Sequence, residues 1–425
     1  MEGRIRRAHL NMNPIGSAVF AGVAVLVAGA AGALFYSVSN LSAVEFKRSD
    51  ASEQSLAAAS PPKVEHIRTP QAVRGVYLSQ CAAASTKLRA EVLDLADSTE
   101  VNAIIVDLKD FTGTVVFSSK TAIEGGSGCT VGDFREFVKD MHARGIYVIG
   151  RMTVFQDPLY SRTHSGYSVQ SLSATAAGAT EFNAVWKDHK GLSFVDVGAR
   201  PFWDYIVTLS KEAHALGVDE INYDYIRYPS DGNMRDVLYL HGKGDKPEEL
   251  ERFFRHLSQE MKQIDGEHTP VLSADLFGIT TTNSSDFSIG QVLERAMPYF
   301  DYIAPMVYPS HYPPGFNGWA DPNKYVYEVV KYALESGIPR ATATTTLIAS
   351  LAYARAGTST PAVYEKPPYP ANILRPWLQD FDYGGNYGPT EVRAQIQAVY
   401  DAGLTSWMLW DPANRYTREA LLPLD

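Results

Sequence analysis

The sequence predicts a (β/α)8 barrel, and two observations carry this prediction. Short apolar stretches alternate with amphipathic helical stretches from residue 73 to the C-terminus, a pattern typical of parallel strands joined by helices. Eight such units fill roughly 350 residues, and no glycine-rich phosphate turn follows the first strand, as an open nucleotide-binding sheet would usually have. At 45% hydrophobic and 11% aromatic, the 425 residues can form one large core or two smaller ones.

The segment before this barrel is predicted to be a membrane anchor. Residues 15–36 carry no charge, follow a basic stretch, and are long enough to cross a bilayer as a helix. Residues 1–14 should then stay in the cytoplasm, which predicts a single-pass protein of the bacterial inner membrane with its C-terminal domain outside the cytoplasm. The small residues 31–33 resemble a cleavage site, so a cleaved signal segment and a secreted protein are the alternative. Residues 37–72 lack apolar periodicity and are predicted to be a flexible linker.

The predicted strands are rich in β-branched and aromatic residues and are bounded by Gly or Pro. They cover residues 74–79, 103–109, 146–155, 218–228, 271–277, 302–308, 374–381 and 406–410. Helices are expected between them, for example over 131–143, 201–216, 248–264 and 389–402, with Pro near the start or Gly after the end in several cases. The barrel domain is therefore predicted to span residues 73–425.

Two long segments exceed a minimal barrel. Residues 157–196 follow the third strand, so they should lie over the functional end of the barrel as a substrate wall or lid, or else be a disordered insertion. Residues 341–372 precede the seventh strand and include a proline-rich stretch. This second segment is compatible with an extended sixth helix followed by a surface loop.

Polar and aromatic residues gather at the carboxyl ends of the predicted strands, which form the functional end of a parallel barrel. A buried carboxylate costs several kcal/mol unless it is paired, so each acid is either partnered or used. Asp224 is the focus, and Arg227 is its predicted ion partner. The other strand-end residues are Asp107, Lys109, Arg151, Asn222, Asp275, Met306, Tyr308, His311, Gln379, Asp380, Trp410 and Asp411. The alternative is that some of these acids only form structural ion pairs with Lys109, Arg151 and Arg227.

Several chemistries lack their residues in this sequence. The ten His are scattered, with neither a His-x-His pair nor an HExxH helix, so no metal or other cofactor is expected. There is no GxSxG elbow and no P-loop. The net charge of -10 disfavours nucleic acid as a partner. What remains is carboxylates flanked by aromatic residues, which are the groups that glycoside hydrolysis uses.

Four motifs resemble those of a bacterial family of glycoside hydrolase-like domains with a (β/α)8 fold. They are residues 219–229 (DEINYDYIRYP), 273–278 (SADLFG), 303–312 (IAPMVYPSHY) and 376–381 (PWLQDF). The resemblance covers about residue 73 to the C-terminus. It implies a glycosidase but does not identify the sugar. The predicted substrate is a polysaccharide or oligosaccharide of the cell envelope or the extracellular space.

A more distant likeness is to the family-18 chitinases, whose fourth strand ends in DxxDxDxE and whose sixth carries Met-x-Tyr. The matching residues are Asp219, Asn222, Asp224, Met306 and Tyr308. Ile226 falls on the position of the chitinase general acid and cannot transfer a proton, so a neighbouring strand must supply the acid. Barrels that resemble α-amylase place an acid at the end of the fifth strand, which points to Asp275.

The predicted catalytic pair is therefore Asp224 as nucleophile or base and Asp275 as general acid, with Arg227 keeping Asp224 ionised. The predicted sugar-binding residues are Asp107, Lys109, Arg151, Asn222, Arg227, Tyr308, His311, Gln379, Asp380, Trp410 and Asp411. Two alternatives stay open: a non-catalytic glycan-binding barrel that has lost its acid, and a membrane-anchored scaffold in which the strand-end charges are structural.

Cys81 and Cys129 follow the first and second predicted strands. The loops after these strands are neighbours at the same end of the barrel. In an exported protein a disulfide between the two residues is expected.

Overall fold

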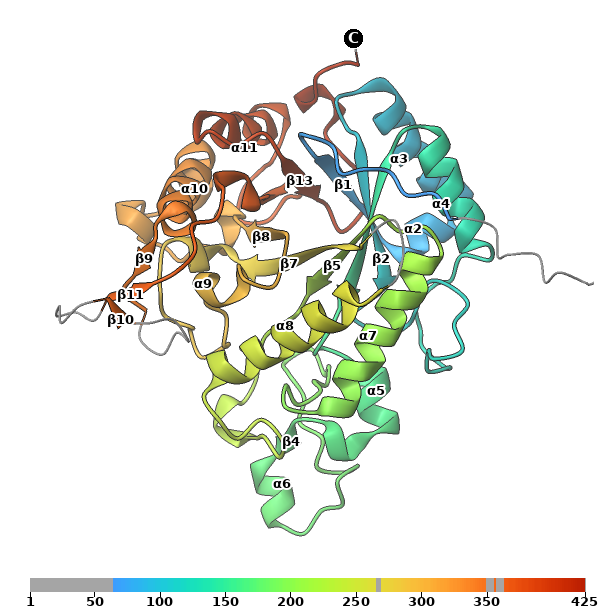
Figure 1. The fold of residues 1–425 in the computed structure, drawn as a ribbon, viewed down its shortest axis with the longest axis vertical. Helices are drawn as coiled ribbons and strands as arrows, with labels where there is room; N and C mark the ends of the chain where they lie inside the picture. The colour runs from blue at the N-terminus through green and yellow to red at the C-terminus, as the bar shows by residue number, and fades with distance from the viewer. Residues whose placement is uncertain (1–63, 265–268, 349–354, 357–362, 425) are drawn as a thin grey trace, which may run out of the picture. The chain divides into compact units, whose positions relative to one another are not determined.

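Eight parallel strands close into a barrel in the computed structural model, which describes residues 64–264, 269–348, 355–356 and 363–424 (Figure 1). Each strand pairs in parallel with both of its neighbours, so the predicted (β/α)8 architecture is confirmed. In order around the barrel the strands are β1 (Arg74–Leu78), β13 (Trp407–Trp410), β12 (Trp377–Gln379), β8 (Tyr302–Met306), β7 (Val271–Phe277), β5 (Glu220–Asp224), β3 (Tyr147–Thr153) and β2 (Ala103–Lys109).

Helices surround the strands and connect them in sequence. They are α2 (Gln80–Ala84), α3 (Thr86–Ser98), α4 (Phe134–Ala143), α7 (Arg200–Ala215), α8 (Lys246–Lys262), α9 (Leu293–Ala296), α10 (Val326–Thr342) and α11 (Pro389–Asp401). In α7 the buried residues Phe202, Ile206 and Leu209 recur at helical spacing and face the barrel. The side chain of Asp245 accepts a hydrogen bond from the Glu248 amide and so caps α8.

The period-2 alternation of the strands divides the core into two layers. Tyr77, Ile105 and Ile149 belong to a cluster that fills the barrel interior together with Trp377. Their neighbours along the strands, such as Val76 and Ile104, belong to the larger cluster between strands and helices. A residue's place in this alternation therefore decides whether it can reach the barrel interior.

The long segment after β3 has an ordered structure. It contains α5 (Pro158–Thr163), β4 (Gln170–Ser171) and α6 (Leu172–Ala176), and β4 pairs antiparallel with β6 (Val237–Leu238) of the segment after β5. The elements α5, β4 and α6 lie together at the bottom of Figure 1. The two long connections thus support each other through backbone pairing.

The second long segment differs from the expected helix and loop. Helix α10 ends at Thr342 and is followed by β9 (Thr345–Thr346), β10 (Arg355–Ala356) and β11 (Val363–Glu365). These strands form a small antiparallel sheet in the order β10-β11-β9. The sequence prediction missed this sheet because its strands are only two or three residues long.

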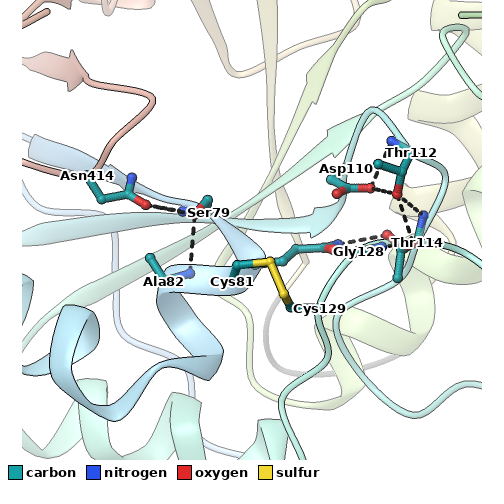
Figure 2. Close-up of a disulfide and its surroundings, with 10 residues drawn as sticks. Ser79, Cys81, Ala82, Asp110, Thr112, Thr114, Gly128, Cys129 and Asn414 are labelled. Atoms are coloured by element: carbon teal, nitrogen blue, oxygen red, sulfur yellow. Dashed lines mark hydrogen bonds between the residues drawn. A yellow bond between two sulfur atoms is a disulfide. The ribbon is translucent and has the colours of Figure 1, made fainter.

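A disulfide joins Cys81, in α2, to Cys129, in the segment before α4 (Figure 2). The adjacent residue Gly128 donates its backbone N–H to Thr114 Oγ1. The cross-link closes a loop of 48 residues in sequence separation. Loops of this size are typically stabilised by about 2–4 kcal/mol when a disulfide closes them, mainly because the unfolded chain loses freedom.

The localisation predicted from the N-terminal segment requires correction. Among the residues that the structure describes, no helix is both long enough and apolar enough to cross a membrane. The predicted anchor at 15–36, with the segments 1–14 and most of 37–72, lies outside the described residues. The structure therefore gives no membrane-spanning helix on which a single-pass inner-membrane location could rest.

Candidate active site

A cavity of about 620 Å³ opens at the carboxyl ends of the strands. Its floor carries charged and aromatic groups, and its upper walls come from the segments that follow β5, β7 and β8. The lining residues are Arg151, Asp224, Tyr225, Arg227, Ser230, Asp275, Phe277, Gly278, Ile279, Phe287, Ile289, Met306, Tyr308, His311, Tyr312, Pro313, Trp377 and Trp410. Both predicted catalytic carboxylates, Asp224 and Asp275, therefore face one space.

Arg151 sits at the centre of the charged floor and contacts three carboxylates. Its Nη1 donates to Asp107 Oδ1 at 2.5 Å, and its Nη2 and Nε donate to Asp224 Oδ2 at 2.5 and 3.2 Å. Its Nε also lies 3.9 Å from Asp275 Oδ2. The indole of Trp410 packs over the guanidinium at 4.9 Å, and Tyr77 stacks on Trp410. Arg151 is thus the shared counter-ion of the site.

Asp275 is held by neutral donors. Its Oδ1 accepts hydrogen bonds from Asn222 Nδ2 and Trp377 Nε1, both at 2.8 Å. The residue is 1% exposed. Burial and the nearby charge of Asp224 raise the pKa of Asp275 well above its ordinary value. Burial and a neighbouring carboxylate therefore both disfavour the charged form of Asp275.

The strand register explains why the two acids meet. In the β5 and β7 pair, Asn222 lies opposite Ser273 and Tyr223 opposite Ala274. Asp224 and Asp275 are the next residues on the two strands, so they leave neighbouring strands at the same level. Asn222 lies one inward-facing position below and donates to both Ser273 Oγ and Asp275 Oδ1.

Asp107 lies behind the cavity wall rather than in it. Its Oδ2 accepts a hydrogen bond of 2.5 Å from the Tyr77 hydroxyl, and its Oδ1 accepts from Arg151. Burial raises the pKa of Asp107, although Arg151 and Tyr77 oppose this effect. Asp107 is therefore not among the residues that line the cavity, and both of its oxygens have protein partners.

Strand β5 ends in a strained turn that aims its side chains. Tyr225 has a φ of 52°, which is uncommon for a bulky residue and costs on the order of 1–2 kcal/mol. Its backbone N–H donates to Asp224 Oδ1 at 2.5 Å. After this turn the side chains of Tyr225 and Arg227 line the cavity, whereas Ile226 is fully buried in the core. The position that carries the acid in chitinases therefore does not face the cavity in this protein.

Arg227 is not the ion partner of Asp224, so this prediction was wrong. The Asp224 carboxylate pairs with Arg151. Arg227 Nη1 donates to the Tyr228 carbonyl and to Ser230 Oγ, both at 3.1 Å. Its guanidinium packs against the rings of Tyr225 and Phe277 at 4.8 and 4.9 Å.

Four residues predicted to bind sugar are not among those that line the cavity and have structural partners. Lys109 is fully buried and pairs with Asp157 at 2.8 Å. Gln379 accepts from Ser310, and Asp380 accepts two hydrogen bonds from Thr417. Asp411 accepts from the backbone N–H groups of Ala413 and Arg415. Strand-end position alone could not distinguish these residues from those that face the cavity.

Tyr308, His311 and Trp410 do line the cavity, as the prediction requires of sugar-binding residues. Burial and the carboxylates of Asp275 and Asp224 raise the pKa of Tyr308, so its hydroxyl stays protonated. The ring of His311 lies edge-on to Tyr308 at 5.3 Å, and burial lowers its pKa. Their roles as sugar ligands remain predictions.

Sequence reasoning missed several functional candidates, namely Tyr77, Tyr225, Phe277, Tyr312 and Trp377. Trp377 is the most informative of them, because it lies in the PWLQDF motif two residues before Gln379 and so faces the same side of the strand. Its indole N–H holds Asp275. Tyr77 could have been found in the same way, as the inward-facing aromatic residue of the first strand.

The other sequence expectations for this end of the barrel also need revision. No residue of 157–196 contributes to the cavity lining, so the expected substrate wall comes instead from the segments after β5, β7 and β8. Asp219, the first position of the chitinase-like pattern, accepts from His142 and the Val148 amide near the start of its strand, far from the lining. Within the described part of the chain, no group of three or more His, Cys, Asp or Glu residues is arranged to hold a metal ion.

Comparison with known proteins places this site in context. The structure resembles the glycoside hydrolase domain of PgaB (BpsB) from Bordetella bronchiseptica, with a TM-score of 0.53, 12% identity, and coverage of 83% of this chain and 99% of that chain. This likeness shows the shared barrel fold.

Two other solved structures match with lower TM-scores. A hypothetical protein from Ruminiclostridium thermocellum ATCC 27405 is 30% identical, with a TM-score of 0.39 and coverage of 47% of this chain and 96% of that chain. A GH18 chitinase from Pseudoalteromonas aurantia is 13% identical, with a TM-score of 0.42 and coverage of 80% and 94%.

None of the curated proteins matches the chain. A family model does, over residues 75–416, and its description is "Putative glycosyl hydrolase domain". This match includes every strand of the barrel except the first residue of β1, together with all the residues that line the cavity. The chain therefore belongs to this glycosyl hydrolase domain family.

Proposed function

We propose that this protein hydrolyses a glycosidic bond in a cell-envelope or extracellular polysaccharide, with Asp275 as the general acid and Asp224 as the nucleophile or base. The observation that carries this proposal is the meeting of these two carboxyl groups in one cavity around a single arginine. Glycosidases use such a pair, in which one group protonates the leaving oxygen and the other attacks the sugar or activates water.

The charge balance of the site supports the assignment of the acid. Three carboxylates share one guanidinium, so a fully ionised cluster would bury excess negative charge. Asp275 has the strongest reason to hold a proton, because it is buried beside Asp224 and its contact with Arg151 is the longest. Its Oδ1 already accepts two N–H groups, which leaves Oδ2 as the atom that carries the proton.

Asp224 has the opposite environment and suits the second role. Arg151 donates two hydrogen bonds to its Oδ2 and the Tyr225 amide donates to its Oδ1, so all three contacts use the carboxylate as an acceptor. Oδ1 keeps a lone pair for attack on the sugar or on a water molecule. An ionised carboxylate in this position would also stabilise the positive charge that develops on the sugar ring.

The separation of the acids bears on the stereochemical outcome. Arg151 Nε is 3.2 Å from Asp224 Oδ2 and 3.9 Å from Asp275 Oδ2. Because both oxygens are close to the same nitrogen, the distance between them cannot exceed the sum of these two distances. This limit includes the ~5 Å separation of retaining enzymes and only the lower end of the inverting range. We therefore expect retention of configuration, with Asp224 as the nucleophile.

The cavity walls support a carbohydrate substrate. Trp377, Trp410 and Tyr308 line the cavity together with the two acids, and Phe277 and Tyr312 add further aromatic surface to its walls. Aromatic rings pack against the apolar faces of sugar rings, while their hydroxyl and N–H groups can bind sugar hydroxyls.

The test is hydrolysis of a panel of cell-envelope and exopolysaccharides by the full chain, measured as new reducing ends. Asp224→Asn and Asp275→Asn should each lower the rate roughly 10²–10⁴-fold while leaving the fold intact. Asp301→Asn is the matched control, because Asp301 caps the opposite end of β7 by accepting from the Leu272 amide. NMR of the first anomer released distinguishes a nucleophile from a base.

Full activity of the Asp224→Asn variant on any hydrolysed glycan would overturn the assignment. The non-catalytic alternative predicts a different pattern, namely glycan binding by the wild-type protein with no new reducing ends from any member of the panel. The scaffold alternative predicts neither binding nor hydrolysis.

A further inference from the structure

Arg227 is a cation in the cavity wall whose neighbours are neutral. Its Nη1 donates hydrogen bonds to the Tyr228 carbonyl and Ser230 Oγ, and the guanidinium also interacts with the Tyr225 side chain. Among the described residues, no carboxylate lies within ion-pair distance of its guanidinium, whereas Arg151 in the same cavity contacts three. Arg227 therefore has no close ion-pair partner among these residues, although the charges of Asp224 and Asp188 still act on it from farther away.

Aromatic rings remove much of the water around this guanidinium. Its Cζ lies 4.8 Å from the Tyr225 ring centre, 4.9 Å from that of Phe277 and 5.9 Å from that of Phe194. Cation–π contacts recover part of the lost hydration, but a half-buried charge without an opposite charge remains costly. A guanidinium without a close opposite charge gains a favourable ion pair when an anion enters the cavity.

The acids nearest to Arg227 are already committed to other groups. Asp224 is paired with Arg151. Asp188 accepts from the backbone N–H groups of Lys190 and Leu192 and from Gln156 Nε2. Neither can turn toward Arg227 without losing these hydrogen bonds.

The geometry leaves the correct edge of the guanidinium for an incoming anion. In Arg151 the Nε and Nη2 edge donates to Asp224 Oδ2. In Arg227 the hydrogen bonds to Tyr228 and Ser230 use Nη1, and among the described residues no carboxylate is within ion-pair distance of the Nε and Nη2 edge. A guanidinium edge of this kind donates two parallel hydrogen bonds to carboxylate, sulfate or phosphate oxygens.

From this arrangement we infer that Arg227 binds an anionic group of the substrate, which makes the substrate an acidic glycan whose sugar carries a carboxylate, sulfate or phosphate. Arg227 and the acids both line the cavity, so the anionic group belongs to a sugar that lies within the cavity beside the bond to be cleaved. The inference rests on the proposed function, because only hydrolysis would make the bound glycan a substrate. The binding of an anionic sugar can nevertheless be measured without hydrolysis.

The experiment measures equilibrium binding of glucuronate, glucose 6-sulfate, glucose 6-phosphate and uncharged glucose to the full chain. Quenching of tryptophan fluorescence gives the signal, because Trp377 and Trp410 line the cavity. We expect at least one anionic sugar to bind about tenfold or more tightly than glucose, the ratio of a charge-assisted hydrogen bond to a neutral one. The three anionic arms show which group is recognised.

Matched variants locate the effect. Arg227→Met should abolish the preference for the anionic sugar, and Arg227→Lys should keep part of it. Arg200→Met is the control, because Arg200 also packs over an aromatic ring, that of Trp203, but pairs with Glu249 outside the cavity. The Asp224→Asn variant should retain the preference, which separates this inference from the proposed catalytic role.

Three results would overturn the inference. The first is equal binding of glucose and all the anionic sugars, which includes the case in which none of them binds. The second is an unchanged preference for the anionic sugar in the Arg227→Met variant. The third is binding of inorganic sulfate as tight as that of the sugar sulfate. If the preference holds but no glycan is hydrolysed, the proposed function fails and the anion site stands. If neutral glycans are hydrolysed equally by Arg227→Met, only the anion site fails.

Discussion

The two ends of the barrel each hold a buried arginine, and the arginines differ in how many acids surround them. At the amino ends of the strands, Arg375 pairs with Glu220, and both side chains are at most 1% exposed. At the carboxyl ends, Arg151 pairs with Asp107 and Asp224 and approaches Asp275. Glu220 and Asp224 are the first and last residues of the same strand, β5. One short strand therefore contributes an acid to each cluster.

The difference teaches how buried charge can serve structure or chemistry. The Arg375–Glu220 pair at the amino ends, the lower pair, has one acid and one base. The Tyr147 hydroxyl donates to Glu220, and the Tyr302 ring packs against Arg375. The cluster around Arg151 at the carboxyl ends, the upper cluster, has an excess of acid and opens to a cavity, and burial raises the pKa values of its Asp107 and Asp275. A buried cluster with equal numbers of acids and bases serves the structure. A buried cluster with more acids than bases, beside a cavity, is a candidate site of acid and base chemistry.

The neighbouring acids follow the same division. Burial acts to raise the pKa of Asp219 at the lower end, but hydrogen bonds from His142 and His66 outweigh it and lower the pKa. Burial raises the pKa values of Asp107 and Asp275 at the upper end, and there the opposing contacts do not cancel it. The pKa of a buried acid is thus lowered where donors surround it, as for Asp219, and raised where another carboxylate is close, as for Asp275.

The largest expected effects come from replacing each of the two arginines in turn, which tests whether one cluster serves activity and the other stability. Arg151→Met leaves Asp107 and Asp224 without a counter-ion, so we expect hydrolysis to fall roughly 10²–10³-fold per folded molecule. Arg375→Met should destabilise the fold and leave activity per folded molecule within about twofold, because its contacts lie outside the cavity. The measurements are kcat/KM on the hydrolysed glycan and unfolding by urea. An equal loss of kcat/KM in both variants would contradict the division.

The lower pair should respond to its acid as well, with an effect on stability alone. Glu220→Gln leaves Arg375 buried without an opposite charge, which typically costs about 3–5 kcal/mol of unfolding free energy. Replacing both residues at once, by Glu220→Leu and Arg375→Met, should cost much less than the single change, because no buried charge remains. A double variant as unstable as Glu220→Gln would show that the pair stabilises the fold beyond its own charge balance.

The smallest expected effect is the dependence of stability on pH that Asp380 causes at the carboxyl ends of the strands. Burial raises the pKa of Asp380 to about 7, although Thr417 donates two hydrogen bonds to it. The folded state then keeps this proton when the unfolded chain has released it near pH 4, so stability falls as pH rises from about 4 to 7 and then levels off. Asp380→Asn mimics the protonated acid, so its stability relative to the wild type should be higher at pH 8 than at pH 4. Urea unfolding at the two pH values tests this, and an unchanged pH slope would contradict it.

Much of the fold and half of the site could be predicted from the residues alone. All eight strands lie within their predicted ranges, because β-branched alternation and Gly or Pro boundaries are local properties of the chain. Asp224 and Asp275 were chosen as strand-end acids, and the structure brings them to one cavity. The exclusions of Lys109, Gln379 and Asp380 from that cavity were not predictable, because the direction of a side chain at a strand end depends on where the strand stops.

The ion partner of Asp224 shows the limit most clearly. Along the sequence Arg227 is only three residues away, but the turn at Tyr225 separates its charge from Asp224. Arg151 is 73 residues away and becomes the partner because β3 and β5 pair with Asn222 opposite Arg151 and Asp224 opposite Thr153. The sequence alone determined the alternation, the strand boundaries and the chemical groups available. Only the tertiary structure decided which groups meet, because register between strands and one positive φ angle set side-chain contacts that no local pattern encodes.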